Sequence, residues 1–163
     1  MRVIFLDIDG VLNTNQVHNP RGFPYVVEDR LVDRFNRLVE RTSARVVLMS
    51  TWRLDPIGLL AAKHFRITFS DVTPDMPEEA RSAEILAWLK AHPEVERFVV
   101  LDDTDDGFET LPFFQTSMDD GLTPDISDGI EAYLLGHRHT SMRQPTSTLL
   151  TDGLAAVTNS IAR

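Results

Sequence analysis

Short runs of apolar residues alternate with amphipathic segments along most of the chain, and this alternation constrains the fold more than any other feature of the sequence. The apolar runs predicted as strands are 2–8, 45–50, 65–70, 97–103 and 111–116. The segments predicted as helices are 28–41, 55–64, a stretch that begins after Pro77, and a stretch from Thr123 to Gly136. The first, second and fourth strands are apolar on both faces, as in a parallel sheet that helices cover on both sides. The pattern predicts an α/β fold with a doubly wound, Rossmann-like parallel sheet of about five strands.

Local signals define two of these helices more closely. The helix after Pro77 is expected to have Glu78 and Glu79 in its first turn, where acidic residues complement the helix dipole. The residues that this helix is expected to turn toward the core are Ile85, Leu86 and Leu89. For the last helix, Thr123 is the expected N-cap and Gly136 the expected C-terminal stop.

The 163 residues are expected to form one domain followed by a distinct tail. The domain is predicted to span 1–136. Residues 137–163 are rich in serine, threonine and small residues, which predicts a loop with one short helix from about 147. Such a tail is expected to dock on the domain or on a neighbouring subunit, where it would form the contact of a homodimer. His137 and His139 have the spacing of metal ligands but lack a third partner, so we interpret them as part of an exposed tail.

Composition and charge exclude several functional classes. The formal net charge of −9 argues against a broad nucleic-acid footprint, which requires basic residues along the phosphate backbone. The absence of cysteine excludes disulfides, thiolate zinc sites and cysteine nucleophiles. No apolar stretch reaches the ~18 residues of a membrane span, and the opening "MRVIFLDID" is too short and too charged for a signal peptide. We therefore expect a cytoplasmic protein without a membrane partner.

Polar side chains follow three of the predicted strands, at the edge of the sheet where open α/β folds bind ligands. They are Asp7 and Asp9 after the first strand, Ser50 and Thr51 after the second, and Asp102 and Asp103 after the fourth. Asp7 and Asp9 begin on one face because side chains alternate along a strand, and Gly10 allows the chain to turn away sharply. Converging carboxylates repel one another unless a hard cation lies among them, and oxygen ligands without histidine or thiol indicate Mg²⁺. Carboxylates, magnesium and a hydroxyl donor together suit phosphoryl transfer.

A D-x-D-G sequence such as the one that begins at Asp7 also occurs in calcium-binding loops. Here an apolar strand precedes the sequence, Val11 and Leu12 follow it, and the twelfth loop position holds no glutamate. These differences make a calcium loop the weaker interpretation.

Four motifs in order resemble those of the haloacid dehalogenase superfamily, the aspartate-nucleophile phosphohydrolases. They are "FLDIDGVLN", "VVLMST", Arg81 at the start of a helix, and "VVLDDTDD". The resemblance covers about residues 2–135. The stretches "STWR" and "RSAEILAWLKAHPEVERFVVLDD" are most similar to small capless members of bacteria and phages, some of them found near RNA-repair enzymes. The gaps between the motifs leave no room for a cap domain, so the site is expected to be open.

The resemblance implies a catalytic role for one residue of each of the first three motifs and for a second aspartate. Asp7 is implied as the nucleophile that becomes an aspartyl phosphate, and Asp9 as the general acid and base. Ser50 is implied as the hydrogen-bond donor to a phosphoryl oxygen. Arg81 is implied as the cation that offsets developing charge, with Lys63 as the runner-up for that role.

The resemblance also implies a magnesium site. Mg²⁺ would be held by the carboxylate of Asp7, the backbone carbonyl of Asp9 and an acidic residue of the last motif. Alignment of "LDD" with the family pattern makes Asp103 the direct ligand and Asp102 its neighbour, although the choice between these adjacent residues stays open.

Because the expected site is uncapped, substrate recognition falls to segments at its rim. The loop 14–27 is expected to hang over the site as a flap. Candidate substrate contacts on this loop are His18, Arg21 and Tyr25. Further candidates after the second motif are Thr51 and Arg53, whereas Trp52 either lines the pocket or belongs to the core.

The sequence thus predicts a magnesium-dependent phosphatase that acts on phosphomonoesters, with nucleotides and polynucleotide ends among the substrates that an open site admits. The alternative is a catalytically weak metal-binding or regulatory protein on the same fold. The side chain of Asp9 favours the enzyme, because metal binding alone has no need of it. A phosphomutase is less favoured, since that chemistry needs a cap to exclude water.

Overall fold

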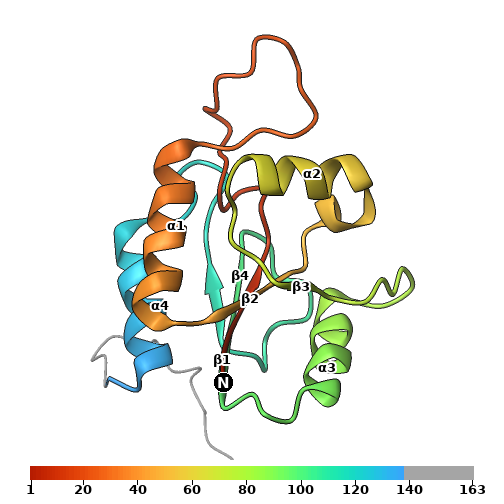
Figure 1. Ribbon diagram of the computed structural model, residues 1–163, viewed down its shortest axis with the longest axis vertical. Helices are drawn as coiled ribbons and strands as arrows, with labels where there is room; N and C mark the ends of the chain where they lie inside the picture. Colours follow the sequence, from red (N-terminus) through yellow and green to blue (C-terminus); the bar gives the residue numbers. More distant parts are fainter. Residues whose placement is uncertain (138–163) are drawn as a thin grey trace, which may run out of the picture.

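The structure is a computed structural model that describes residues 1–137. Its strands are β1 (Arg2–Leu6), β2 (Arg45–Leu48), β3 (Asp71–Val72), β4 (Arg97–Asp102) and β5 (Phe113–Gln115). Its helices are α1 (Asp29–Thr42), α2 (Pro56–His64), α3 (Arg81–Ala91) and α4 (Pro124–Leu135), with a short 3-10 helix, η1 (Thr51–Leu54). The strands form one parallel sheet in the order β3-β2-β1-β4-β5 (Figure 1). The predicted α/β fold with five strands is confirmed, and the described residues include no cap domain.

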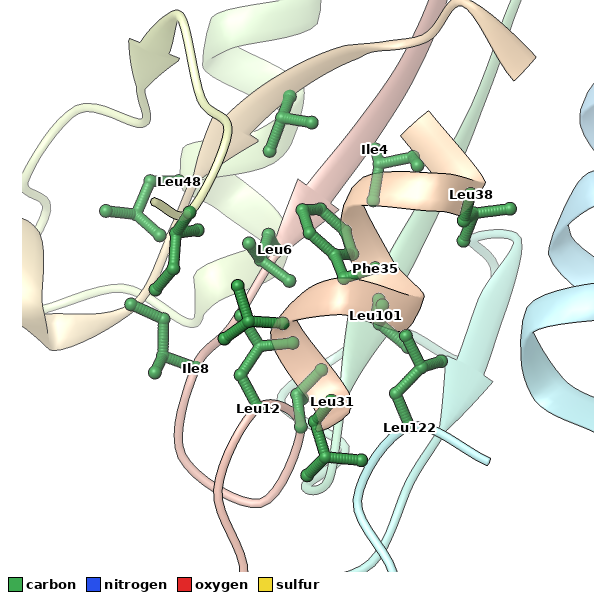
Figure 2. Packing of buried hydrophobic residues seen from close by; sticks show 14 of the residues in the cluster. Ile4, Leu6, Ile8, Leu12, Leu31, Phe35, Leu38, Leu48, Leu101 and Leu122 are labelled. Carbon is green, nitrogen blue, oxygen red and sulfur yellow. The ribbon is translucent and has the colours of Figure 1, made fainter. Parts of the chain in front are cut away.

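Two apolar clusters, one on each face of the sheet, hold the helices in place. Successive residues of β1 alternate between them, because side chains along a strand point to opposite faces: Ile4 and Leu6 belong to the first cluster, and Val3 and Phe5 to the second. The first cluster includes residues of α1 and α4 and Ala62 of α2, and the second includes residues of α3. Figure 2 shows the first cluster, in which the labelled residues of α1 are Leu31, Phe35 and Leu38. The sheet is therefore covered on both faces, as the apolar strands predicted.

The third strand does not lie where the sequence predicted it. The apolar run 65–70 was expected to be the strand, but β3 comprises only Asp71 and Val72. The first residues of the run complete the end of α2: Arg66 takes a left-handed backbone conformation, with φ of 58°, and the amide of Ile67 still bonds to a carbonyl of that helix. Ser70 is the first residue of the run whose amide bonds to β2. The end of the helix thus delays the strand.

Helix α3 begins later than predicted, and one of its three predicted core residues is exposed instead. Residues 77–79 form a turn, so the helix starts at Arg81 and the expected acidic pair lies outside its first turn. Leu86, expected in the core, is 52% exposed, whereas Trp88 is buried and packs edge-on against Phe5 with ring centroids 5.4 Å apart. Trp88 lies three residues after the buried Ile85 and shares its face, while Leu86 is rotated by about 100° from it.

Helix α4 confirms the predicted capping signals. The side chain of Thr123 accepts a hydrogen bond from the amide of Ile126, and Gly136 ends the helix in a left-handed conformation with φ of 79°. The predicted tail helix from about 147, the tail-mediated homodimer and His139 lie outside the described residues.

No helix within residues 1–137 combines the length and the apolar character that crossing a membrane requires.

Candidate active site

Neighbouring strands β1 and β4 end side by side and bring three carboxylates together. Asp7 directly follows β1, and its amide donates to the carbonyl of Leu101 in β4 over 2.9 Å. Asp102 is the last residue of β4, and Asp103 follows it. One side-chain oxygen from each of the three aspartates lies within 4.8 Å of the others. The strand ends therefore converge as the sequence predicted.

These carboxylates line an open cavity of about 320 Å³ at the carboxyl edge of the sheet. Its walls are formed by Asp7, Asp9, Arg81 and the residues from Asp102 to Asp106. Gly10 allows the chain to turn sharply after β1 while Asp103 lies close to it. The φ of Gly10 is +71°, and a Cβ built at this position would lie 2.5 Å from Cγ of Asp103. Glycine is thus required both by the backbone conformation and by the close approach of Asp103.

The first residue of α3 supplies the cation of the cavity. Nη1 of Arg81 donates to Oδ1 of Asp7 over 3.1 Å and to Oδ2 of Asp102 over 2.8 Å. The amide of Arg81 is bonded in turn to the carboxylate of Asp106, at 3.2 Å. Lys63, the alternative from the sequence, is exposed at the end of α2 and is not part of the cavity wall.

The carboxylates of the cavity carry more negative charge than Arg81 offsets. Burial, reinforced by the charge of Asp102, raises the pKa of Asp7 to about 7, although Arg81 opposes the shift. Burial likewise raises the pKa of Asp102 to about 6, against the opposing effects of the Thr104 amide and Arg81. The pKa of Arg81 is raised, because the charges of Asp7 and Asp102 outweigh the lowering effect of its burial. A divalent cation with a preference for oxygen ligands fits this charge balance and this donor set.

Asp9 lies at the rim of the cavity, and both of its carboxylate oxygens are held. Nδ2 of Asn13 donates to Oδ1 of Asp9 over 2.7 Å, and Nε1 of Trp52 donates to Oδ2 over 3.0 Å. The ring of Trp52 belongs to the first core cluster and is 3% exposed. Trp52 is therefore a core residue whose indole N–H reaches the rim of the cavity.

A family comparison accounts for this arrangement. The model of the "HAD domain in Swiss Army Knife RNA repair proteins" matches residues 3–126, which include all four sequence motifs. The chain belongs to this family. Its predicted membership of the haloacid dehalogenase (HAD) superfamily is confirmed, and this membership favours phosphatase-type activity. No curated protein and no solved structure matches the chain at a significant level.

In this HAD domain, the second motif spans the end of β2 and leads into η1. Ser50 is fully buried, caps η1 and accepts a hydrogen bond from the amide of Trp52 at 3.4 Å. Thr51 is exposed. Neither residue is part of the cavity wall.

Arg53, which the sequence offered as a substrate contact, instead holds the second motif to α3. Its guanidinium is buried and forms an ion pair with Glu84 of α3 at 2.6 Å. Its remaining hydrogen bonds go to the backbone carbonyls of Met49, Ser50, Thr73 and Pro74. All five N–H groups of the guanidinium are thus engaged within the protein. Arg53 has no donor left for a substrate.

The loop 14–27 rises beyond the carboxyl edge of the sheet, above α2 in Figure 1. His18 and Arg21 are exposed, and neither is part of the cavity wall. Tyr25 packs against Trp52 with ring centroids 4.8 Å apart, and its hydroxyl donates to Asp55, the N-cap of α2. The loop and α2 enclose a second, apolar hollow of about 410 Å³, lined by Phe23, Pro24, Tyr25, Ile57, Leu60, Ala61, His64 and Phe65.

Sequence reasoning did not identify Asn13 as a site residue and left the place of Trp52 open. Asn13 closes a short loop in which its Oδ1 accepts from the amide of Gly10 at 2.9 Å, and asparagine is a common turn residue because its side chain bonds to nearby backbone groups. The contact between Trp52 and Asp9 joins segments 43 residues apart, so only the folded chain reveals it.

Proposed function

We propose that this HAD domain is a magnesium-dependent phosphatase that hydrolyses phosphomonoesters through a phosphorylated Asp7. The observation that carries the proposal is the position of the Asp7 carboxylate. It is buried against Asp102, bonded to Arg81 at 3.1 Å, and faces an open cavity of about 320 Å³. A carboxylate that is desolvated and held at the wall of an open cavity suits nucleophilic attack better than a structural role.

The proposed reaction has two steps that share one proton carrier. In the first, an oxygen of Asp7 forms a bond to phosphorus, the ester P–O bond breaks, and Asp9 donates a proton to the leaving oxygen. In the second, Asp9 takes a proton from water, the water oxygen attacks phosphorus, and the bond to Asp7 breaks to release inorganic phosphate. The acid of the first step is thereby restored for the next turnover.

Two further residues would bind the phosphoryl oxygens. Arg81 lies where it can offset the charge that develops on them, since its guanidinium already contacts Asp7. Ser50 is the proposed neutral donor: within residues 1–137 its hydroxyl accepts a hydrogen bond from Trp52 but donates none, so its proton is free for a ligand.

Asp7 and Asp103 are the side chains that we propose to hold Mg²⁺, together with the backbone carbonyl of Asp9. Both oxygens of Asp102 are already engaged, one by Arg81 at 2.8 Å and the other by the amide of Thr104 at 3.0 Å. Among the described residues, Asp103 accepts a single side-chain bond, from the hydroxyl of Thr104 at 3.3 Å, so it retains more capacity to bind a cation. When bound, Mg²⁺ would favour the ionised form of Asp7 and neutralise phosphoryl oxygens.

The substrate class that we propose is the phosphorylated end of an RNA chain or a nucleotide. The family takes its name from RNA repair proteins, and the described residues include no cap that would bar a large substrate. With a net charge of −9, the protein is better suited to bind a terminal phosphate than a long stretch of backbone.

The experiment is a measurement of phosphate release by the full chain, first with EDTA and then with Mg²⁺. The substrates are nucleoside monophosphates, oligoribonucleotides with a 3′ or a 5′ phosphate, and p-nitrophenyl phosphate. We expect magnesium-dependent release, with a preference for one of the nucleotide substrates. Acid quenching during turnover should trap a phosphoryl group on Asp7 that mass spectrometry detects.

The control is Asp7→Asn, which keeps the size of the side chain and removes the nucleophile. We expect it to lower kcat by at least about 10³-fold while the protein remains folded. Turnover at the wild-type rate in this variant would overturn the covalent mechanism. Magnesium binding without hydrolysis of any substrate would instead favour the regulatory alternative.

A further inference from the structure

Asp9 transfers protons in the proposed mechanism. Its side chain is exposed, so its position does not by itself fix the orientation of the carboxylate. An exposed carboxylate samples several rotamers, and only some of them direct an oxygen toward a substrate in the cavity. Proton transfer requires the carboxylate to lie within hydrogen-bond reach of the leaving oxygen. Whatever holds Asp9 therefore affects the rate.

Trp52 holds one oxygen of Asp9 from a rigid position. Its indole N–H donates to Oδ2 over 3.0 Å, while its ring is 3% exposed within the first core cluster. Tyr25 packs edge-on against the same ring, at 4.8 Å between centroids. A buried indole with one N–H has a single direction in which to donate, so it defines the place of Oδ2.

Asn13 holds the other oxygen and is equally constrained. Its side chain is 6% exposed, and its carbonyl oxygen accepts from the amide of Gly10 at 2.9 Å. Its amide nitrogen donates to Oδ1 of Asp9 over 2.7 Å and to the carbonyl of Val26 over 2.9 Å. The carbonyl oxygen and one N–H of Asn13 are thus held by backbone groups, which direct its other N–H toward Asp9.

We propose that Trp52 and Asn13 are positioning residues that orient the carboxylate of Asp9 for proton transfer, an assignment that rests on the phosphatase function proposed above. Each oxygen of a carboxylate can accept about two hydrogen bonds. The bonds from Trp52 and Asn13 occupy one site on each oxygen, so a site on each remains for a proton. The two donors fix the group without blocking it.

The same contacts link Asp9 to the end of the loop 14–27. Tyr25 packs on Trp52, and the neighbouring Val26 accepts from Asn13. Adjacent residues of the loop thus support both donors, whereas the exposed His18 and Arg21 touch neither. The part of the loop that serves the chemistry is its C-terminal end.

The test is Trp52→Phe, which keeps an aromatic ring in the core and removes the indole N–H. Two substrates are compared, glycerol 2-phosphate, whose alkoxide leaving group needs a proton, and p-nitrophenyl phosphate, whose phenolate does not. With Mg²⁺ present, we expect kcat for the alkyl ester to fall about 10- to 100-fold and that for the aryl ester by less than about threefold. Equal losses with both esters would mean that Trp52 acts only on the fold, and would overturn the assignment.

Trp88→Phe is the matched control. Trp88 is also buried, and its indole N–H donates to a carboxylate, that of Asp71, over 3.1 Å, but it lies in the second cluster, away from the cavity. This variant loses the same kind of hydrogen bond and should leave the ratio of the two rates unchanged.

A second measurement does not depend on turnover. The chain has only two tryptophans, so its NMR spectrum contains two indole N–H signals, which the two Phe variants assign. In Asp9→Ala, the Trp52 signal should move upfield because a bond to a charged acceptor is lost, while the Trp88 signal stays in place. An unmoved Trp52 signal would overturn the hydrogen bond itself. If the Trp52 signal moves but the wild type hydrolyses no substrate, the hydrogen bond between Trp52 and Asp9 is correct and the proposed phosphatase function is wrong.

Discussion

Two arginine–carboxylate contacts meet at the first turn of α3, and they differ in how completely their charges are matched. Glu84 pairs with Arg53 at 2.6 Å, and the two side chains are only 7% and 4% exposed. Arg81, three residues before Glu84, is 26% exposed and contacts two carboxylates, those of Asp7 and Asp102. The first contact is a neutral pair, whereas the second is part of a cluster in which acids outnumber the cation.

The difference separates a structural role from a binding role. Every N–H of Arg53 has a partner, so the pair with Glu84 has nothing left to offer a ligand. The cluster around Arg81 keeps a net negative charge. Desolvation by burial, together with this excess negative charge, raises the pKa of Asp7 to about 7. Excess negative charge at the wall of a cavity allows that cavity to bind a cation. Whether an arginine beside a motif can contact a substrate therefore depends on how many of its N–H groups are already bonded within the protein.

The largest expected effect comes from breaking the matched pair. Glu84→Gln should lower the free energy of unfolding by about 3–5 kcal/mol, because it leaves the guanidinium of Arg53 buried without its counter-charge. Chemical denaturation at pH 7.5 measures the loss. The double variant Arg53→Met with Glu84→Met should regain much of it, since apolar side chains carry no buried charge. A loss below about 1 kcal/mol in Glu84→Gln would show that the pair is not a structural element.

A smaller effect, measured on activity, is expected from the unmatched cluster. Arg81→Met should lower kcat/KM for phosphomonoesters by about 10²-fold, because the phosphoryl oxygens lose a preorganised cation. Its matched control, Arg81→Lys, keeps the charge but not the planar donor and should lose about tenfold. Steady-state kinetics with Mg²⁺ measures both. Equal kcat/KM in all three proteins would remove Arg81 from the mechanism.

The smallest expected effect is the pH dependence of stability without metal. Folding raises the pKa of Asp7 to about 7 and that of Asp102 to about 6, above the ordinary 3.8. The folded protein therefore holds more protons than the unfolded chain, so this contribution to stability is complete below about pH 4 and is lost as the pH rises through 6 and 7.

Thermal unfolding in EDTA measures this effect. Between pH 5 and pH 8, Tm should fall further in the wild type than in Asp7→Asn, by about 2–4 °C for a difference on the order of 1 kcal/mol. Mg²⁺ should recover more stability at pH 8 than at pH 5, because it binds the ionised carboxylates. A wild type that loses no more Tm than Asp7→Asn would contradict the origin of the shift.

The sequence predicted the parts of the fold that depend on local pattern. The apolar runs of β1, β2 and β4 alternate with helices as expected, and capping residues such as Thr123 and Gly136 act within a few positions of themselves. Motif positions at the strand ends follow from the same pattern. The predictions fail where a local sequence signal competes with a neighbouring element of the fold. The run 65–70 reads as a strand by composition, but the end of α2 extends into it.

The roles of individual side chains beside the motifs were harder to predict, because they depend on partners that are distant in sequence. Arg53 and Trp52 both follow the second motif. One turns inward to Glu84, 31 residues away, and the other donates to Asp9, 43 residues away. No periodicity or spacing within "STWR" distinguishes these outcomes.

The attachment of the acidic residues to the central strands has a consequence for the lifetime of the site. The amide of Asp7 bonds to β4, and the carbonyl of Asp102 accepts from Thr116 beyond β5, while Val3–Leu6 of β1 are wholly inaccessible to solvent. Amides in such strands exchange with deuterium only when the whole domain opens, whereas those of exposed loops exchange through local fluctuations. Asp7 and Asp102 are thus expected to belong to the slowest-exchanging unit within residues 1–137, and His18 and Arg21 to a faster one. On warming, we expect the loop 14–27 to loosen first, whereas the spacing between the acidic residues should persist until the sheet itself separates.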